Sequence, residues 1–285
     1  MRPLKIITDS TCDLNKEDIE RLEIVVLPLH VNFKEKSYDD GVNLTVPELY
    51  KLVEEEKVLP KTAALSIMEF VEEFKKWVSR GYDVIYTGIS GKMSSTLNNA
   101  NLAISELGAE NQIKAIDSKN LSTGIGLIVL KAAEYAKEGK GLEFVSDYIL
   151  DVRERVKSQF LIDTFDYLYK GGRCNSMQRI FGTMLKIKPI IVVRNGVMDV
   201  AQKPHGKKKA LEALLQMISS DESILDKERI MVTHSLADEE AKYLVDELKD
   251  RLGLTNIMVT RAGSVISSHC GPGTIGILYI TNNLK

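Results

Sequence analysis

The stretch Asp83–Leu107, with the sequence DVIYTGISGKMSSTLNNANLAISEL, predicts a strand followed by a helix. The apolar run Val84–Ile89 is typical of a buried strand. After a hydroxyl-rich turn, apolar residues recur with helical spacing at Leu97, Ala100, Ile104 and Leu107. A strand that leads into a helix places the turn between them at the carboxyl end of a sheet, where α/β proteins bind ligands.

The turn itself offers hydrogen-bond donors to an anion. The first amides of a helix have no internal partner and carry the positive end of the helix dipole. Together with the hydroxyls of Ser94, Ser95 and Thr96, they would form a small uncharged cradle for a carboxylate or a phosphate. The alternative is that Ser94 or Ser95 only caps the helix.

Strand-like and helical segments alternate through the first half of the chain, beginning with the strand Leu4–Thr8. Thr45 and Ser66 are predicted to start helices, with KEKSYDDGVNL as a polar connection and LPKTAALS as a loop. A strand over Ile113–Ile116 and helices near 122–137 and 142–156 complete this half. The alternation predicts a parallel sheet with helices on both faces.

Beyond residue 156 the pattern changes. A strand is predicted for the stretch FLIDTF. A Gly-rich turn that leads into a short helix is predicted for the stretch LYKGGRCNSMQRIFGTML. Asn195-Gly196 joins two β-like runs, which is a strong hairpin signal. The predicted fold is therefore α/β: an amino-terminal α/β/α domain with a parallel sheet (residues 1–156) packed against a smaller mixed α/β domain with a partly antiparallel sheet (157–285).

Composition restricts the function classes. A net charge of −2 gives no general attraction to nucleic acid or anionic membranes. The amino terminus leaves no room for a signal peptide, and no apolar run is long enough to be an integral membrane segment. Three widely spaced cysteines predict neither a disulfide framework nor a metal cluster, and His30, His205 and His234 do not make metal-ligand spacing with any of them. We expect a cytoplasmic protein without metal or cofactor.

Several other features have ordinary structural explanations. Asp9-Ser10 and Asp117-Ser118 end two predicted strands and are typical of local turns, with a ligand-facing role as the alternative. Gly91-Lys92 does not belong to a phosphate loop, because Met93 stands where such a loop needs Ser or Thr. The basic stretch 203–209, KPHGKKK, is either a solvated helix start or a partner-docking patch. Five methionines are predicted in the core or along an apolar tunnel: Met68, Met93, Met177, Met184 and Met198.

Six motifs occur in the order seen in one family: TDSTCDL, PKTAALS, ISGKMSSTLNNA, DSKNLSTGIG, YLYKGGRCN and SSHCGPGTIGILY. Over essentially its full length the chain resembles the DegV family of bacterial fatty-acid-binding proteins. The resemblance implies the fold described above, the EDD fold, with a lipid between and within the two domains. It also implies no catalysis by this chain, which would present the fatty acid to a separate fatty acid kinase.

Carried over residue by residue, the resemblance implies that Thr62, Ser94 and His269 hold the lipid carboxylate, backed by the amides of Ser95 and Thr96. It places Arg173 near the pocket mouth or the contact between the domains.

The chain departs from the family pattern at Ala63-Ala64-Leu65, Ser95-Thr96-Leu97 and Cys270. His205 replaces a basic residue, usually arginine, on the surface implied to recognise the kinase. Relative to the family, the first three changes would alter which acyl tail fits, and the last would weaken the basis for kinase docking.

Two other functions use the same site. An acyl hydrolase could employ Ser94 with His269, although no G-x-S-x-G nucleophile elbow is present. A phosphate or nucleotide binder could use the same helix terminus. The function predicted first is binding of a long-chain fatty acid, with its carboxylate on Thr62, Ser94 and His269 and its tail in an apolar tunnel.

Overall fold

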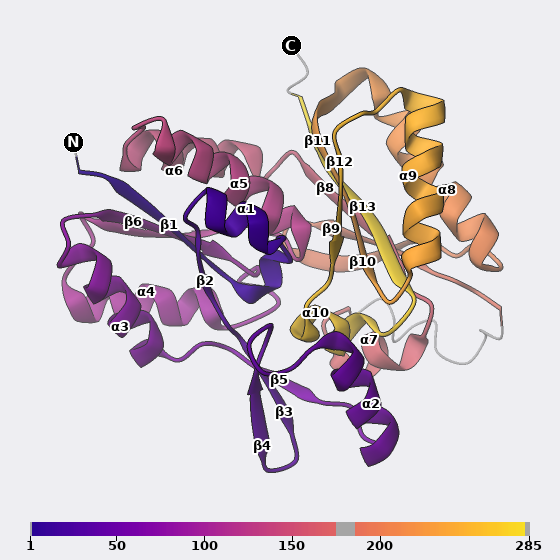
Figure 1. The fold of residues 1–285 in the computed structure, drawn as a ribbon, viewed down its shortest axis with the longest axis horizontal. Coiled ribbons are helices and arrows are strands. Elements are labelled where there is room, and N and C mark those ends of the chain that lie inside the picture. Colours follow the sequence, from indigo (N-terminus) through magenta and orange to yellow (C-terminus); the bar gives the residue numbers. More distant parts are fainter. Residues whose placement is uncertain (1, 175–185, 283–285) are drawn as a thin grey trace.

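The computed structural model describes residues 2–174 and 186–282, which form a mixed α/β fold (Figure 1). A four-stranded parallel sheet has the order β2-β1-β6-β7, and a six-stranded mixed sheet has the order β10-β9-β8-β13-β11-β12. The predicted fold class is therefore confirmed. The division at residue 156 stays a prediction, although the strands of the parallel sheet lie within 4–117 and those of the mixed sheet within 156–281.

The parallel sheet is covered on both faces. Helices α3 and α4 lie on one face and α5 and α6 on the other (Figure 1). Thr45 and Ser66, which were predicted to start helices, start α2 and α3, each with a capping box. The elements of this part are β1 (Leu4–Asp9), η1 (Ser10–Cys12), α1 (Lys16–Arg21), β2 (Val25–Leu27), α2 (Val46–Glu56), α3 (Ile67–Val78), β6 (Asp83–Gly88), α4 (Thr96–Leu107), β7 (Ile113–Asp117), α5 (Thr123–Lys137) and α6 (Leu142–Val152).

The mixed sheet is covered by α8 and α9 on one face and by α5 on the other. The predicted hairpin at Asn195-Gly196 joins β9 and β10, and both turn residues have the positive φ angles that such a turn requires. The elements of this part are β8 (Val156–Leu161), α7 (Phe165–Gly171), β9 (Ile190–Arg194), β10 (Val197–Gln202), α8 (Lys207–Ser220), η3 (Glu222–Ile224), β11 (Leu225–Ser235), α9 (Asp238–Leu252), β12 (Ile257–Arg261), α10 (Ser264–Cys270) and β13 (Thr274–Thr281).

Helix α5 lies between the two sheets and contacts strands of both. Its residues Thr123–Leu130 are all buried, which explains why they are almost continuously apolar rather than amphipathic. One apolar core surrounds the parallel sheet and α5, and a second lies between the mixed sheet and the helices α8 and α9. The shared helix joins the two layers into one packed structure.

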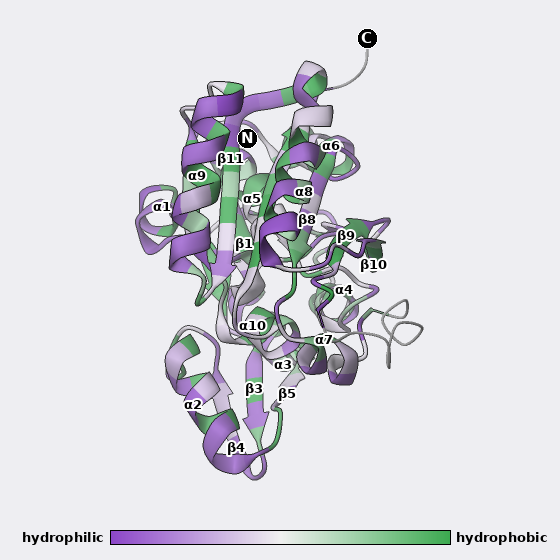
Figure 2. Cartoon of the chain, turned by 90° about the vertical axis from the view of Figure 1, so that its right-hand side faces the viewer, coloured by the Kyte–Doolittle hydropathy of each residue, from purple (hydrophilic) through white to green (hydrophobic). Residues whose placement is uncertain are grey.

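The structure corrects the expectation for two segments of the first half. The predicted polar connection contains β4 (Lys36–Asp39), and the predicted loop LPKTAALS contains β5 (Lys61–Ala63). Both pair with β3 (His30–Phe33) in a small antiparallel sheet. Strands β4 and β5 are short, and β4 is hydrophilic throughout (Figure 2). They therefore lack the apolar alternation by which strands are recognised.

Element assignments after residue 141 also differ from the prediction. Helix α6 ends at Val152, and β8 begins at Val156, so only the first two residues of FLIDTF are in the strand. Helix α7 begins at Phe165, the last residue of FLIDTF, and runs to Gly171, where a turn was expected. The short helix α10 was not predicted, because polar residues dominate it and only tertiary packing buries them. The helix expected after the Gly-rich turn lies mainly outside the described residues, as do Met177 and Met184.

Candidate ligand-binding site

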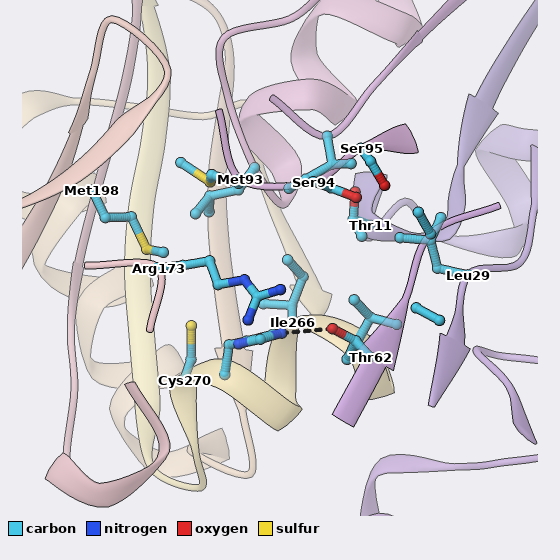
Figure 3. A pocket seen from close by; sticks show the side chains of 16 residues that line it. Thr11, Leu29, Thr62, Met93, Ser94, Ser95, Arg173, Met198, Ile266 and Cys270 are labelled. Atoms are coloured by element: carbon cyan, nitrogen blue, oxygen red, sulfur yellow. Dashed lines mark hydrogen bonds between the residues drawn. The ribbon is translucent and has the colours of Figure 1, made fainter. Parts of the chain in front are cut away.

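A cavity of about 320 Å³ opens between β5, the turn before α4, and α10 (Figure 3). This volume is at the lower end of the range of ~300–1000 Å³ found for small-molecule sites. Its polar lining residues are Thr11, Thr62, Ser94, Ser95, Arg173 and His269. Its larger apolar lining residues are Leu29, Ile89, Met93, Leu121, Met198, Val265 and Ile266. The cavity therefore combines a cluster of hydrogen-bonding groups with aliphatic walls.

Thr62 and His269 are brought together by elements that are distant in the sequence. Thr62 lies in β5, and His269 lies in the last turn of α10. The Thr62 Oγ1 atom is 2.8 Å from His269 Nε2, so the two side chains share a hydrogen bond. The other ring nitrogen, Nδ1, is inaccessible and has no hydrogen-bond partner among residues 2–174 and 186–282.

The surroundings of His269 keep its ring neutral. Burial, with a contribution from the positive charge of Arg173, lowers the pKa of His269 to about 4. The imidazole is therefore uncharged at neutral pH and carries one proton. Nδ1 faces Gly171, where a β-carbon would be only 2.6 Å away. Glycine at this position leaves the space that the ring occupies.

Two buried carboxylates hold the start of α10. Asp13 accepts a hydrogen bond from the Gly263 amide at 2.7 Å, and Asp40 accepts one from the Ser264 amide at 2.6 Å. Burial raises the pKa of Asp13 well above its ordinary value and that of Asp40 to about 6. Because these acids directly follow η1 and β4, they connect the first half of the chain to the helix that carries His269. No local sequence pattern predicted this contact.

The serine-rich turn before α4 supplies another part of the lining. The Ser94 hydroxyl lies 2.7 Å from Thr96 Oγ1 and accepts a hydrogen bond from the Thr96 amide at 3.3 Å. Ser95 is exposed and makes no capping hydrogen bond through its side chain. Thr96 is buried and does not line the cavity. The Thr96 amide is thus engaged by Ser94 itself, and of the three hydroxyl residues Ser94 and Ser95 face the ligand space.

Arg173 brings a positive charge to the same cavity. It follows α7, is exposed to solvent, and donates a hydrogen bond from Nη1 to the Gly171 carbonyl at 2.7 Å. Figure 3 shows its side chain extending into the cavity toward Thr62, with Ser94 and Ser95 above. Five of the six predicted site residues thus line one space, namely Thr62, Ser94, Ser95, Arg173 and His269, whereas Thr96 does not.

The other candidates from the sequence take structural positions. Asp9 is buried and accepts hydrogen bonds from the Tyr86 hydroxyl at 2.7 Å and the Ile89 amide at 2.9 Å. Asp117 accepts one from the Lys119 amide at 2.8 Å, as expected for a local turn. Met93 and Met198 line the cavity, whereas Met68 is 55% exposed and belongs neither to the core nor to the tunnel.

In residues 2–174 and 186–282, no group of three or more acidic, histidine or cysteine side chains could hold a metal ion. Over the same residues, no helix has both the length and the apolar character needed to cross a membrane.

Some residues that line the cavity were not predicted from the sequence. They include Thr11, Leu29 and Leu121, whose residue types carry no local signal for a binding site.

Together, these features define a mixed α/β protein with an amphiphilic cavity at the carboxyl end of its parallel sheet. The family model described as "Uncharacterised protein, DegV family" matches residues 3–282, and the chain belongs to the DegV family.

Relatives from several bacteria agree with this assignment. A DegV domain-containing protein of Clostridium perfringens is 37% identical over 282 residues, which are 98% of this chain and 99% of the relative. A DegV family protein from Thermus thermophilus, whose structure is described with fatty acid binding, superposes on this structure with a TM-score of 0.91. The two sequences are 31% identical, and the superposition covers 99% of this chain and 100% of that one. DegV of Bacillus subtilis, described as a fatty acid binding protein, has a TM-score of 0.87 and 29% identity, with coverage of 99% and 100%.

Proposed function

We propose that this protein binds a long-chain fatty acid in the cavity, with the carboxylate on Thr62, Ser94 and His269. The observation that carries the proposal is the Thr62–His269 hydrogen bond inside a cavity that Ser94 also lines. The fatty-acid-binding relatives from Thermus thermophilus and Bacillus subtilis support the ligand class.

The neutral histidine suits this task. When Nε2 carries the proton, it donates to Thr62 Oγ1, and the Thr62 hydroxyl is then free to donate to a carboxylate oxygen. Ser94 can donate in the same way when the Thr96 hydroxyl donates to Ser94 Oγ. Arg173 adds a charge that attracts the anion toward the cavity. The carboxylate would thus receive hydrogen bonds from uncharged hydroxyls beside the exposed cation of Arg173.

The tail would lie along the aliphatic walls and supply most of the affinity. About fifteen methylenes at ~0.8 kcal/mol each give on the order of 12 kcal/mol gross. Association and ordering costs of several kcal/mol reduce that sum to roughly micromolar binding or better. A second space of about 20 Å³ shares Leu121, Ile266 and Cys270 with the cavity and continues toward Phe160 and Leu278. The tail would extend in this direction.

The proposal includes a role without catalysis, as a cytoplasmic carrier that presents its lipid to a fatty acid kinase. A hydrolase would need Ser94 to share a proton with His269, but Nε2 is bonded to Thr62 and Nδ1 faces Gly171. The basic stretch 203–209 starts α8 and exposes His205, Lys208 and Lys209, which suits docking of a partner protein.

The direct test is to extract the purified protein with organic solvent and identify lipids by mass spectrometry. We expect a long-chain fatty acid at close to one per chain, and less of it in Thr62→Val, which keeps the side-chain shape. Absence of any fatty acid, with no uptake of added palmitate, would contradict the proposal. Ester hydrolysis that disappears in Ser94→Ala would favour the hydrolase instead, and displacement of a bound ligand by nucleotide but not by fatty acid would favour a nucleotide binder.

A further inference from the structure

The small space of about 20 Å³ beyond the ligand cavity is here called the terminal pocket. It shares Leu121, Ile266 and Cys270 with the ligand cavity, and these three side chains form a neck between the two spaces. Burial raises the pKa of the Cys270 thiol to about 12, so the neck is uncharged. A water molecule needs ~10–15 Å³ of such space, so the terminal pocket has room for about one or two carbon atoms.

Phe160 and Gly276 close the terminal pocket on the side of the mixed sheet. Gly276 in β13 lies opposite Phe160 in β8 and, on its other side, opposite Thr233 in β11. Residues directly opposed in antiparallel strands project from the same face, so Phe160 and Thr233 flank a position without a side chain. A β-carbon at Gly276 would lie 2.8 Å from that of Phe160. Glycine therefore gives Phe160 its place at the end of the pocket.

The polar side chains around the terminal pocket are already engaged within the protein. His234 Nδ1 accepts a hydrogen bond from the Ala237 amide at 3.1 Å, and burial lowers the pKa of the His234 ring. A hydroxyl or carboxylate on the end of a lipid tail would therefore lose its hydrogen bonds to water without replacement. The hydroxyl groups that line the pocket lie within hydrogen-bonding distance of these partners: Ser122 of Asp13 (2.5 Å), Thr233 of Thr123 (2.5 Å) and Thr260 (2.9 Å), Ser235 of Tyr50 (2.6 Å), and Thr274 of the Cys270 carbonyl (2.8 Å).

We propose that Phe160 sets the longest acyl chain that the protein accepts, and that the terminal pocket takes an unsubstituted methyl end. This inference rests on the proposed fatty acid site, because it assumes that the carboxylate is held at Thr62 and Ser94. With the head fixed there, each added methylene moves the chain end through the neck toward Phe160. Chains beyond the limiting length must displace a buried ring or leave methylenes in water, and both lower the affinity.

The test measures the affinity of a series of saturated fatty acids of increasing length, by displacement of a fluorescent fatty acid. In wild type the affinity should rise with length and then fall beyond a limit. Phe160→Ala should move this limit upward by roughly two to four carbons, because it leaves the space of a phenyl ring. The first acid that wild type rejects should bind at least about tenfold tighter to this variant. Phe160→Leu removes less of the side chain and should move the limit by a smaller step, which keeps the test usable if the alanine variant does not fold.

Phe74→Ala is the matched control. Phe74 is fully buried in α3 and lines neither the ligand cavity nor the terminal pocket, so its truncation removes the same side chain from the core elsewhere. Its limiting length should equal that of wild type. A limit that stays the same in both Phe160 variants, or that moves equally in Phe74→Ala, would overturn the proposal.

The methyl end is tested separately with palmitate and 16-hydroxyhexadecanoic acid. The hydroxylated acid should bind wild type at least about tenfold more weakly, because its terminal hydroxyl is buried without a partner. Equal affinities would refute an apolar end to the site. If no fatty acid of any length binds, the proposed function itself fails, whereas binding with a limit that does not depend on Phe160 refutes this inference alone.

Discussion

Replacement of Gly171 by alanine tests how the position of His269 determines ligand binding. The φ angle of Gly171 is not positive, so its backbone does not require glycine. An added β-carbon would lie 2.6 Å from His269 Nδ1, whereas ordinary van der Waals contact begins at 3.4 Å. The ring would have to retreat by about 0.8 Å. It cannot move that far toward Thr62, because Nε2 is already 2.8 Å from the hydroxyl. We expect the ring to rotate and the hydrogen bond to break.

The energetic cost follows from three contributions. Overpacking costs ~1–3 kcal/mol, and loss of the hydrogen bond adds about 1 kcal/mol. Alanine in place of glycine at the end of a helix returns ~0.5–1 kcal/mol. The free energy of unfolding, measured by denaturant titration, should therefore fall by ~1–3 kcal/mol. Fatty acid affinity, measured by displacement of a fluorescent fatty acid, should fall about tenfold as the Thr62 hydroxyl loses its fixed orientation.

Gly172→Ala is the matched control. Gly172 has a φ of +67°, and no atom of the described residues lies within 4 Å of an added β-carbon, so alanine there strains the backbone by ~1–2 kcal/mol without touching His269. The two variants should lose similar stability, but only Gly171→Ala should lose affinity. Equal fatty acid affinity in both variants would refute the reasoning.

Three further predictions concern single side chains. Ser94→Ala should weaken fatty acid binding about tenfold with the fold intact, and unchanged affinity would remove Ser94 from the site. The pKa of Asp40 is about 6 in the folded protein, against an ordinary value of 3.8, so the folded state holds this proton more tightly than the unfolded state does. The free energy of unfolding should therefore decrease by up to about 3 kcal/mol as the pH rises from about 4 to 6. Asp40→Asn should flatten this part of the pH profile in denaturant titrations, and an unaltered profile would show that Asp40 does not ionise there. The pKa of His269 is about 4, so in lipid-free protein its ring should remain neutral down to about pH 5 in an NMR titration. A titration midpoint of the His269 ring near pH 6.5 would contradict its burial.

Sequence patterns predicted the elements whose signals are local. Apolar runs located β1, β6 and β7, and the side chains that cap helices located α2 and α3. The Asn-Gly pair located the β9–β10 hairpin, because few other residues adopt two successive positive φ angles. The same approach failed for β4, β5 and α10, which are short and largely polar, because neighbouring elements rather than their own periodicity determine their conformation.

The site divides in a similar way. Resemblance to a family identified Thr62, Ser94, Arg173 and His269, which the fold brings to one cavity. No local pattern could show that the two carboxylates Asp13 and Asp40 would bind backbone amides more than 200 residues away. Such contacts depend on how the elements pack, and they give α10 the position from which His269 reaches Thr62.

The central claim is that two hydroxyl groups, one positioned by the neutral His269 and the other by Thr96, hold the head of a fatty acid. A crystal structure of the complex with palmitate tests this claim most directly. We predict the carboxylate within hydrogen-bonding distance of the Thr62 and Ser94 hydroxyls, His269 Nε2 still bonded to Thr62, and the tail passing Leu121 and Ile266. A carboxylate bound elsewhere, or an inverted lipid with its tail end at Thr62, would contradict the account.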